Sequence, residues 1–176
     1  MSKIRRINFI ASAGAGKSLT ALNICAQLKF KGYDAELIEE PIKEWTYIPR
    51  IPKDCDSYFL QASQIQKEDI RLRAGVDLIV SDSPLMLQYF YAMYHKVPLQ
   101  ESMRLAALEY EKIYPSLNIF IDREDKFYNE VGRYEKLAEA KRIDILIKGT
   151  LSQCCSEFFS AIMMIDANNG RYRTRD

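Results

Sequence analysis

The sequence predicts an α/β domain in which a parallel sheet lies between two layers of helices, and two observations support this. Short apolar runs rich in β-branched residues alternate with helix-like segments along the whole chain, as in repeated strand–helix–strand units. The runs are apolar throughout, as strands covered on both faces should be. The five candidate strands are residues 6–10, 35–38, 77–80, 117–121 and 161–165.

Helical segments fill the intervals between these strands. The candidate helices are residues 18–31, 57–73, 84–94, 99–113 and 134–158. Gly32 and Gly75 follow the first two segments, where glycine commonly ends a helix, and Pro84 suits the first turn of the third. A chain of 176 residues has the length of one domain, which we expect to span residues 1–170 and to end in a frayed basic tail at 171–176.

Charge and cysteine content argue against several classes of protein. The 25 basic and 24 acidic side chains give a net charge of +1, so no overall field directs the chain to nucleic acid or to an anionic membrane. The apolar runs are far shorter than the roughly 20 residues of a membrane span. The four cysteines lack the CxxC spacing of a zinc site, and His95 is the one histidine that could join them. We therefore expect a cytoplasmic protein with reduced thiols.

The strongest motif follows the first predicted strand, where residues 11–18 read Ala-Ser-Ala-Gly-Ala-Gly-Lys-Ser and lead directly into a helix. Such a loop curls so that successive N–H groups point at phosphate oxygens, and the helix N-terminus adds partial positive charge. Lys17 would reach the β- and γ-phosphates of ATP, and the Ser18 hydroxyl would coordinate Mg²⁺. The residues expected to contact the nucleotide are Ala13, Gly14, Ala15, Gly16, Lys17, Ser18 and Leu19.

The motif departs from the usual pattern at one position, because Ala11 stands where such loops begin with glycine. Alanine tolerates the negative φ of a strand end. The competing interpretation is a Gly/Ala-rich turn with an exposed lysine, and the strand and helix that flank the loop favour the phosphate-binding interpretation. The motif predicts the three-layer αβα fold of P-loop NTPases, with five parallel strands in the order 2-3-1-4-5 and a lid after the fourth strand.

An acidic residue follows the third predicted strand at the edge of the sheet where the phosphate loop begins. This residue is Asp82, and a carboxylate in that position orients Mg²⁺ directly or through water. The alternative is that Asp82 caps the helix that opens at Pro84, which is a common function of aspartate. We favour the metal role, so that Ser18 and Asp82 are the predicted magnesium ligands.

A second acidic segment, residues 39–45, follows the second predicted strand at the same edge of the sheet. Its Glu-Pro pair and nearby tryptophan resemble the sequence that closes strand two in deoxynucleoside kinases. The resemblance implies that Glu40 is the general base for an acceptor hydroxyl and that Trp45 packs on a nucleobase. The alternatives are a surface acid at Glu40 and a core or lid aromatic at Trp45. Those kinases carry arginine directly after the strand-three acid, whereas this chain has Ser83.

The chain is also similar, over nearly its full length, to small bacteriophage P-loop proteins related to nicotinamide riboside kinase domains. The shared features are the phosphate loop, the acid after strand two, Asp-Ser-Pro after strand three, and Gly132-Arg133 after strand four. For a phage-encoded protein, the cytoplasm would be that of the host.

Three glutamines, Gln61, Gln64 and Gln66, lie on the second predicted helix. An amide can form two hydrogen bonds with a base edge, so a glutamine that faces the acceptor could recognise it. Solvent exposure is the ordinary alternative for a helical glutamine. Gln64 is the predicted substrate contact.

The charged segment 123–134 is the predicted lid. Arg123, Lys126 and Arg133 bracket it, and Gly132 could act as a hinge. In P-loop kinases a closing lid brings arginines to the transferred phosphoryl group, where they offset developing charge and exclude water. The alternative is solvated cations that pair with Glu124, Asp125 and Glu130. Arg123 and Arg133 are the predicted catalytic residues of the lid.

These residues predict an ATP-dependent phosphotransferase that moves the γ-phosphoryl group of MgATP to a nucleoside, nucleotide or nucleoside-like acceptor. Lys17, Glu40, Asp82, Arg123 and Arg133 are the predicted catalytic residues. One alternative is a bacteriophage kinase that acts on a modified base in DNA, such as a hydroxymethylated pyrimidine. A second is a P-loop ATPase or nucleotide-binding switch with no acceptor. We expect no membrane partner, and the sequence leaves a homodimer open.

Overall fold

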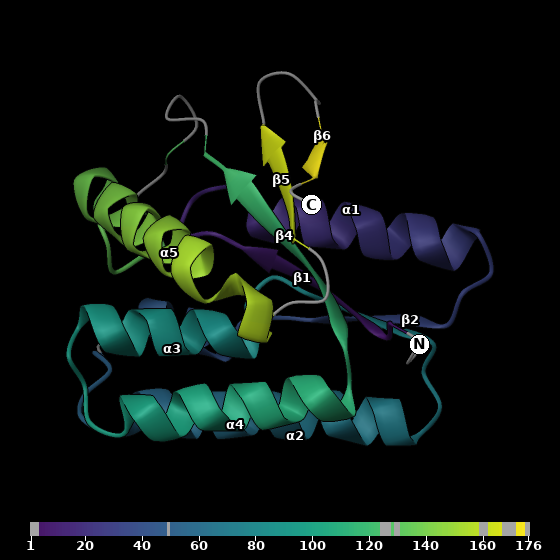
Figure 1. The fold of residues 1–176 in the computed structure, drawn as a ribbon, viewed down its shortest axis with the longest axis horizontal. Coiled ribbons are helices and arrows are strands. Elements are labelled where there is room, and N and C mark those ends of the chain that lie inside the picture. The colour runs from purple at the N-terminus through teal and green to yellow at the C-terminus, as the bar shows by residue number, and fades with distance from the viewer. Residues whose placement is uncertain are drawn as a thin grey trace.

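One mixed sheet forms the centre of the protein in the computed structural model, which describes residues 4–48, 50–123, 128, 131–158, 162–166 and 172–174 (Figure 1). Within these residues the sheet has six strands in the order β2-β3-β1-β4-β5-β6. The strands are β1 (Arg6–Ile10), β2 (Ala35–Ile38), β3 (Leu78–Ser81), β4 (Ser116–Asp122), β5 (Ile162–Asp166) and β6 (Tyr172–Thr174).

The centre of the sheet is parallel and its last edge is not. β1 pairs with β3 on one side and β4 on the other, with Arg6 opposite both Ile79 and Ser116. The order of the first four strands is as predicted. β5 pairs parallel with β4, and the prediction missed a sixth strand, β6, which pairs antiparallel with β5. β6 lies within the predicted tail, which the sequence suggested would fray.

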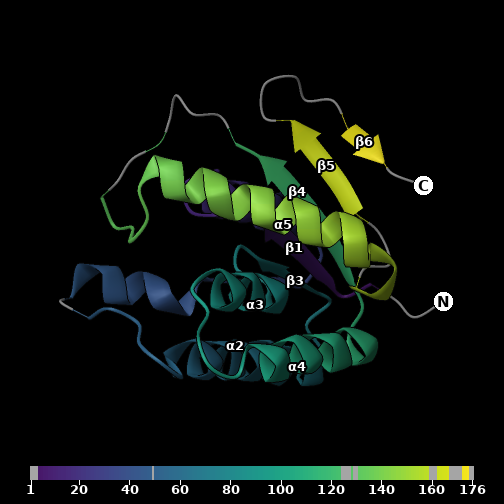
Figure 2. The same cartoon turned by 60° about the vertical axis from the view of Figure 1, so that its left-hand side comes forward.

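Helices cover both faces of the sheet. They are α1 (Lys17–Phe30), the 3₁₀ helix η1 (Pro41–Tyr47), α2 (Asp56–Arg73), α3 (Leu85–Tyr94), α4 (Gln100–Ile113) and α5 (Leu137–Phe158). α1 packs on Phe9, Val80 and Ile119, whereas α3 and α5 pack on Ile10 and Phe120. Adjacent residues of a strand point to opposite faces, so α1 lies on one side of the sheet and α3 and α5 on the other. Figure 1 shows α1 apart from α3 and α5, and Figure 2 shows α3 next to α5. No helix in the described ranges has the length and apolar character required to cross a membrane.

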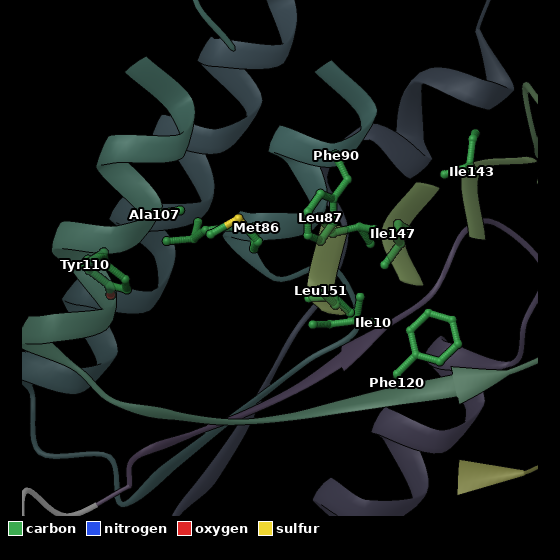
Figure 3. Close-up of a cluster of buried hydrophobic side chains, with 11 residues drawn as sticks. Ile10, Met86, Leu87, Phe90, Ala107, Tyr110, Phe120, Ile143, Ile147 and Leu151 are labelled. Carbon is green, nitrogen blue, oxygen red and sulfur yellow. The ribbon is translucent and has the colours of Figure 1, made fainter. Parts of the chain in front are cut away.

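The larger core cluster lies between the sheet and helices α3, α4 and α5 (Figure 3). Phe90 of α3 and Phe120 of β4 are 1% and 2% exposed, and Ile143 and Ile147 of α5 are completely buried beside them. Each such side chain contributes about 1.5–3 kcal/mol on burial. This packing fixes α5 against the carboxyl end of β1, which is where the phosphate loop begins.

A buried charge network joins the other end of β1 to the helices. Arg6 is 2% exposed, and its Nη1 lies 3.2 Å from Oε2 of Glu68 on α2. Its Nη2 pairs with Glu111 of α4, and its Nε donates to the Tyr114 carbonyl at 2.8 Å. Burial raises the pKa of Glu68, and Arg6 opposes that shift. The arginine is therefore the counter-ion that allows two acids to remain inside the fold.

Replacement of this arginine should be costly. Arg6→Met leaves Glu68 and Glu111 without their cation, so we expect the free energy of unfolding to fall by about 3–5 kcal/mol in urea titrations. Lys112→Ala is the control, because its pair with Glu109 at 2.6 Å is exposed and should contribute little. Equal losses in the two variants would contradict a stabilising role for the buried network.

Candidate active site

The predicted phosphate loop has a curled backbone in the structure. Gly14 and Gly16 have φ values of +78° and +88°, in the left-handed region that glycine adopts without strain. Gly16 is the N-cap of α1, and the helix begins at Lys17. The first N–H groups of α1 and the positive end of the helix dipole therefore lie at the loop, as a phosphate site requires.

Lys17 reaches across this loop. Its side chain is buried, and its Nζ donates a hydrogen bond of 2.8 Å to the Ser12 carbonyl. Burial lowers the pKa of Lys17, and the nearby carboxylates of Glu40, Asp82 and Asp144 oppose this shift. The ammonium group is thus turned into the site and not into solvent.

Asp82 directly follows β3 and is 4% exposed. Its Oδ1 is buried and has no hydrogen-bond partner among the described residues. It does not cap α3, since the N-cap of that helix is Pro84 and no side chain caps it. A buried carboxylate oxygen without a partner fits the coordination of a cation.

Magnesium fits these donors in one particular way. Within the described residues, no three His, Cys, Asp or Glu side chains form a group that could hold a metal. Mg²⁺ commonly binds through one or two protein oxygens and completes its shell with water and substrate phosphates. Ser18, which lines the pocket from the first turn of α1, and Asp82 could supply those oxygens.

Glu40 follows β2 and lines the same pocket as Lys17. Its Oε1 accepts a long hydrogen bond of 3.5 Å from Ser83 Oγ, which in turn accepts one of 3.0 Å from Gln88 Nε2. Burial raises the pKa of Glu40 to about 7, Lys17 opposes this effect, and Asp82 adds to it. A carboxyl group with a pKa near neutrality suits a general base.

Arg133 lies above the phosphate loop, where the sequence placed a lid cation. A Cβ atom added to Gly14 would lie 3.2 Å from Arg133 Nη1 and 2.6 Å from the Tyr128 ring. Arg133 Nη1 is buried and has no hydrogen-bond partner among the described residues. A guanidinium nitrogen so placed can bind an anion held by the loop. Lys126, Glu124, Asp125 and Glu130, which also entered the lid prediction, lie outside the described residues.

Arg123 occupies a different position from the one predicted. Its Nε lies 2.5 Å from Oδ2 of Asp144 on α5, and its Nη2 donates to the Ala13 carbonyl at 2.9 Å. It does not line the pocket. The reason is that β4 continues to Asp122, so Arg123 leaves the strand beside the end of β1 and contacts the loop from behind.

Two predicted substrate contacts lie in the interior instead. Gln64 is completely buried, and its Nε2 donates to Glu68 Oε1 at 2.9 Å and to Ser81 Oγ at 3.3 Å, because its face of α2 packs on the sheet. Trp45 is 9% exposed, and the guanidinium group of Arg50 lies 3.4 Å from its ring centroid. Neither residue lines the pocket, so the structure does not support their roles in base recognition.

The pocket itself has a volume of about 740 Å³ and extends from the phosphate loop across α3 to the start of α5. Several polar residues of its wall had no role in the sequence analysis, and they include Gln88, Tyr91, His95 and Glu135. Tyr91 Oη accepts the Ala13 N–H at 3.0 Å, and burial raises the pKa of Glu135. The spacing of Gln88 and Tyr91 on the helix that follows Asp82, with His95 at its C-cap, was the available signal, since residues three and four apart share a helix face.

Two segments meet over the pocket. Tyr134 Oη donates a hydrogen bond of 2.6 Å to the Arg50 carbonyl. A Cβ atom on Gly132, where φ is +73°, would lie 3.0 Å from Tyr47 Oη. The end of the predicted lid therefore contacts the segment between η1 and α2, and together they partly enclose the site.

The loop geometry makes Gly14 sensitive to substitution. Gly14→Ala places a Cβ against Tyr128 at positive φ, so we expect a loss of about 1 kcal/mol or more in unfolding free energy, together with weaker MgATP binding by calorimetry. In Gly149→Ala, on α5, the new Cβ lies within 4 Å of no described atom outside its own helix backbone and chain neighbours, so stability should rise by about 0.5–1 kcal/mol. Tolerance of the Gly14 change would argue against the tight approach of Tyr128 and Arg133.

Comparisons with known proteins extend the fold assignment. No protein-family model matches the chain, and a search of curated proteins found no match. Among solved structures, the chain is similar to a thymidylate kinase from Ehrlichia chaffeensis, with a TM-score of 0.65 and 12% sequence identity. The match covers 94% of this chain and 89% of that one. The chain therefore shares the α/β fold of that protein.

Proposed function

We propose that the chain is an ATP-dependent kinase that transfers the γ-phosphoryl group of MgATP to a nucleoside, nucleotide or nucleoside-like acceptor. The observation that carries the proposal is the presence of Glu40, with a pKa of about 7, in the same pocket as the curled loop and Lys17. The pocket also extends from the phosphate loop past Glu40 to α3 and the start of α5, which leaves room for an acceptor beside this carboxyl group. The fold shared with a thymidylate kinase supports a nucleotide-related acceptor.

The phosphate loop supplies the binding and charge stabilisation in this proposal. The amides around Gly14 and Gly16 and the ammonium of Lys17 would bind the β- and γ-phosphates. Ser18 and Asp82 would hold Mg²⁺, which offsets phosphate charge when it is bound. Arg133 Nη1 would donate to the oxygens of the transferred group, where negative charge must be stabilised.

Glu40 would act on the acceptor. As the acceptor hydroxyl oxygen bonds to the γ-phosphorus, the bond from that phosphorus to the β–γ bridging oxygen breaks and ADP leaves. Glu40 takes the hydroxyl proton, which requires that it begin ionised. Gln88, Tyr91 and His95 offer polar groups along the acceptor wall, and the enclosure by Tyr134 restricts water.

The enclosure also favours a small acceptor over a base within DNA. The contact between Tyr134 and Arg50 closes one side of the pocket, and a polymer would have to part it. An assay with labelled ATP should therefore transfer phosphate to free nucleosides or nucleotides in preference to single-stranded oligonucleotides. Transfer to oligonucleotides alone would favour the alternative function in DNA modification.

Lys17 is the first residue to test. Lys17→Ala should weaken MgATP binding roughly 10- to 100-fold in calorimetry, because a charged hydrogen-bond donor to the phosphates is lost. Lys31→Ala is the control, because Lys31 is an exposed lysine at the far end of the same helix and should bind MgATP as the natural chain does. Normal affinity in Lys17→Ala would remove the loop from the proposed site.

Glu40 gives a pH-dependent prediction. A base with a pKa of about 7 is protonated at pH 6 and ionised at pH 8, so kcat/KM for the acceptor should rise between these values. Glu40→Gln should lower the rate about 100-fold or more and abolish this rise, with little change in MgATP affinity. Glu39→Gln, at the exposed neighbouring position, should retain both the rate and the profile. An unchanged profile in Glu40→Gln would assign the proton transfer to another group.

A further inference from the structure

A buried carboxylate holds the rear of the phosphate loop. Asp144 of α5 is 7% exposed, and its Oδ1 accepts the backbone N–H of Ser12 at 2.7 Å. Its other oxygen, Oδ2, lies 2.5 Å from Arg123 Nε. Both partners lie within or beside the loop, and neither Asp144 nor Arg123 lines the pocket.

The remaining donors of this group also contact the loop. Arg123 Nη2 donates to the Ala13 carbonyl at 2.9 Å and to Ser12 Oγ. Ser12 Oγ donates to the Ala140 carbonyl of α5 at 2.7 Å, and the Ser12 carbonyl accepts from Lys17 at 2.8 Å. The N–H, the carbonyl and the hydroxyl of Ser12 are thus all engaged, which fixes the peptide from which the curl starts.

This arrangement has a consequence for the direction of the loop amides. A phosphate cradle works only if its N–H groups point inward before the ligand arrives. Gly14 and Gly16 can adopt the positive φ values that the curled loop needs, but glycine does not favour that conformation over the others open to it. Contacts at the start of the loop can make that selection. Tyr91, Ala140 and Lys17 each contribute one hydrogen bond there, and Arg123 and Asp144 together contribute three.

We propose that Asp144 and Arg123 are a positioning pair that holds the phosphate loop in its binding conformation through Ser12 and Ala13. The proposal rests on the proposed function to the extent that MgATP is the ligand of the loop. Arg123 then acts through the backbone of the loop and not as a cation of the lid. The orientation of the cradle depends on α5, which lies more than a hundred residues further along the chain.

The competing explanation is a simple structural bridge between β4 and α5. A second ion pair joins the same two elements, with Lys148 Nζ 2.8 Å from Asp122 Oδ1. That pair is partly exposed, and no hydrogen bond joins it to the loop in the described residues. Removing the pair of Lys148 and Asp122 is therefore a matched control, because it breaks an ion pair between β4 and α5 without touching the phosphate loop.

The test compares Asp144→Asn with Lys148→Met. Asparagine keeps an oxygen for the Ser12 N–H and removes the charge that holds Arg123, so the variant should fold. We expect MgATP binding to weaken roughly 10- to 100-fold in calorimetry, with the acceptor KM unchanged, because a misoriented cradle affects the nucleotide only. Hydrogen exchange of the ligand-free protein should accelerate at residues 11–16 and not in the body of α5. Lys148→Met should change neither the MgATP affinity nor the hydrogen exchange at residues 11–16.

Arg123→Lys provides a second variant. It keeps a positive charge for Asp144 but loses the guanidinium N–H groups that reach Ser12 and Ala13. We therefore expect a smaller loss of MgATP affinity and a smaller acceleration of exchange at residues 11–16 than in Asp144→Asn. The proposal would be overturned if both variants exchanged hydrogen at residues 11–16 as slowly as the natural chain does. It would also be overturned if the acceleration spread over α5 and β4. Since this measurement needs no nucleotide, it decides the role of the pair even if the natural chain fails to bind MgATP, a result that would instead refute the proposed function.

Discussion

The site depends on one buried cation balanced by carboxylates from three parts of the chain. Lys17 opens α1, and its ammonium group interacts with Glu40 after β2, Asp82 after β3 and Asp144 on α5. A cation removed from water is stable only where opposite charge compensates it. The parallel order β2-β3-β1 brings the first two acids to the same edge of the sheet, and the core between α3 and α5 brings the third. The charge balance around Lys17 therefore depends on the strand order of the sheet and on the packing of α5.

Local sequence determined how much of this arrangement could be predicted. The loop and the acids after β2 and β3 follow from short-range patterns, because a Gly-rich turn between strand and helix has few alternative structures. The burial of Gln64 and Trp45 away from the pocket could not be predicted from local sequence, since the face that a helix presents to a pocket depends on how it packs. Asp144 carried no local signal, because its importance arises from contact with a residue 132 positions earlier in the chain. The antiparallel β6 likewise depends on pairing with β5 and not on the apolar pattern that marked the other strands.

The fold alone does not identify the proposed acceptor. The residues at the edge of the sheet indicate which parts of the pocket could recognise it. The chain shares its α/β fold with a thymidylate kinase at 12% identity, so few side chains are held in common. Ser83 is completely buried, and it binds Glu40 and Gln88 where deoxynucleoside kinases carry arginine. A hydroxyl in this place orients neighbours but brings no charge to an acceptor. In the proposed function, recognition of the acceptor would then depend on the other pocket walls, which α3, the start of α5 and the segment from η1 to α2 form.

The hydrogen bond between Tyr134 and the Arg50 carbonyl bears on how molecules enter and leave. A neutral hydrogen bond has a net worth of about 1 kcal/mol, which thermal motion breaks readily. Neither partner belongs to a long helix, so the two segments can separate while the sheet and the packed helices stay intact. Entry to the pocket then requires only a local fluctuation, and in the proposed kinase the departure of product, in place of the bond-making step, would be able to limit turnover.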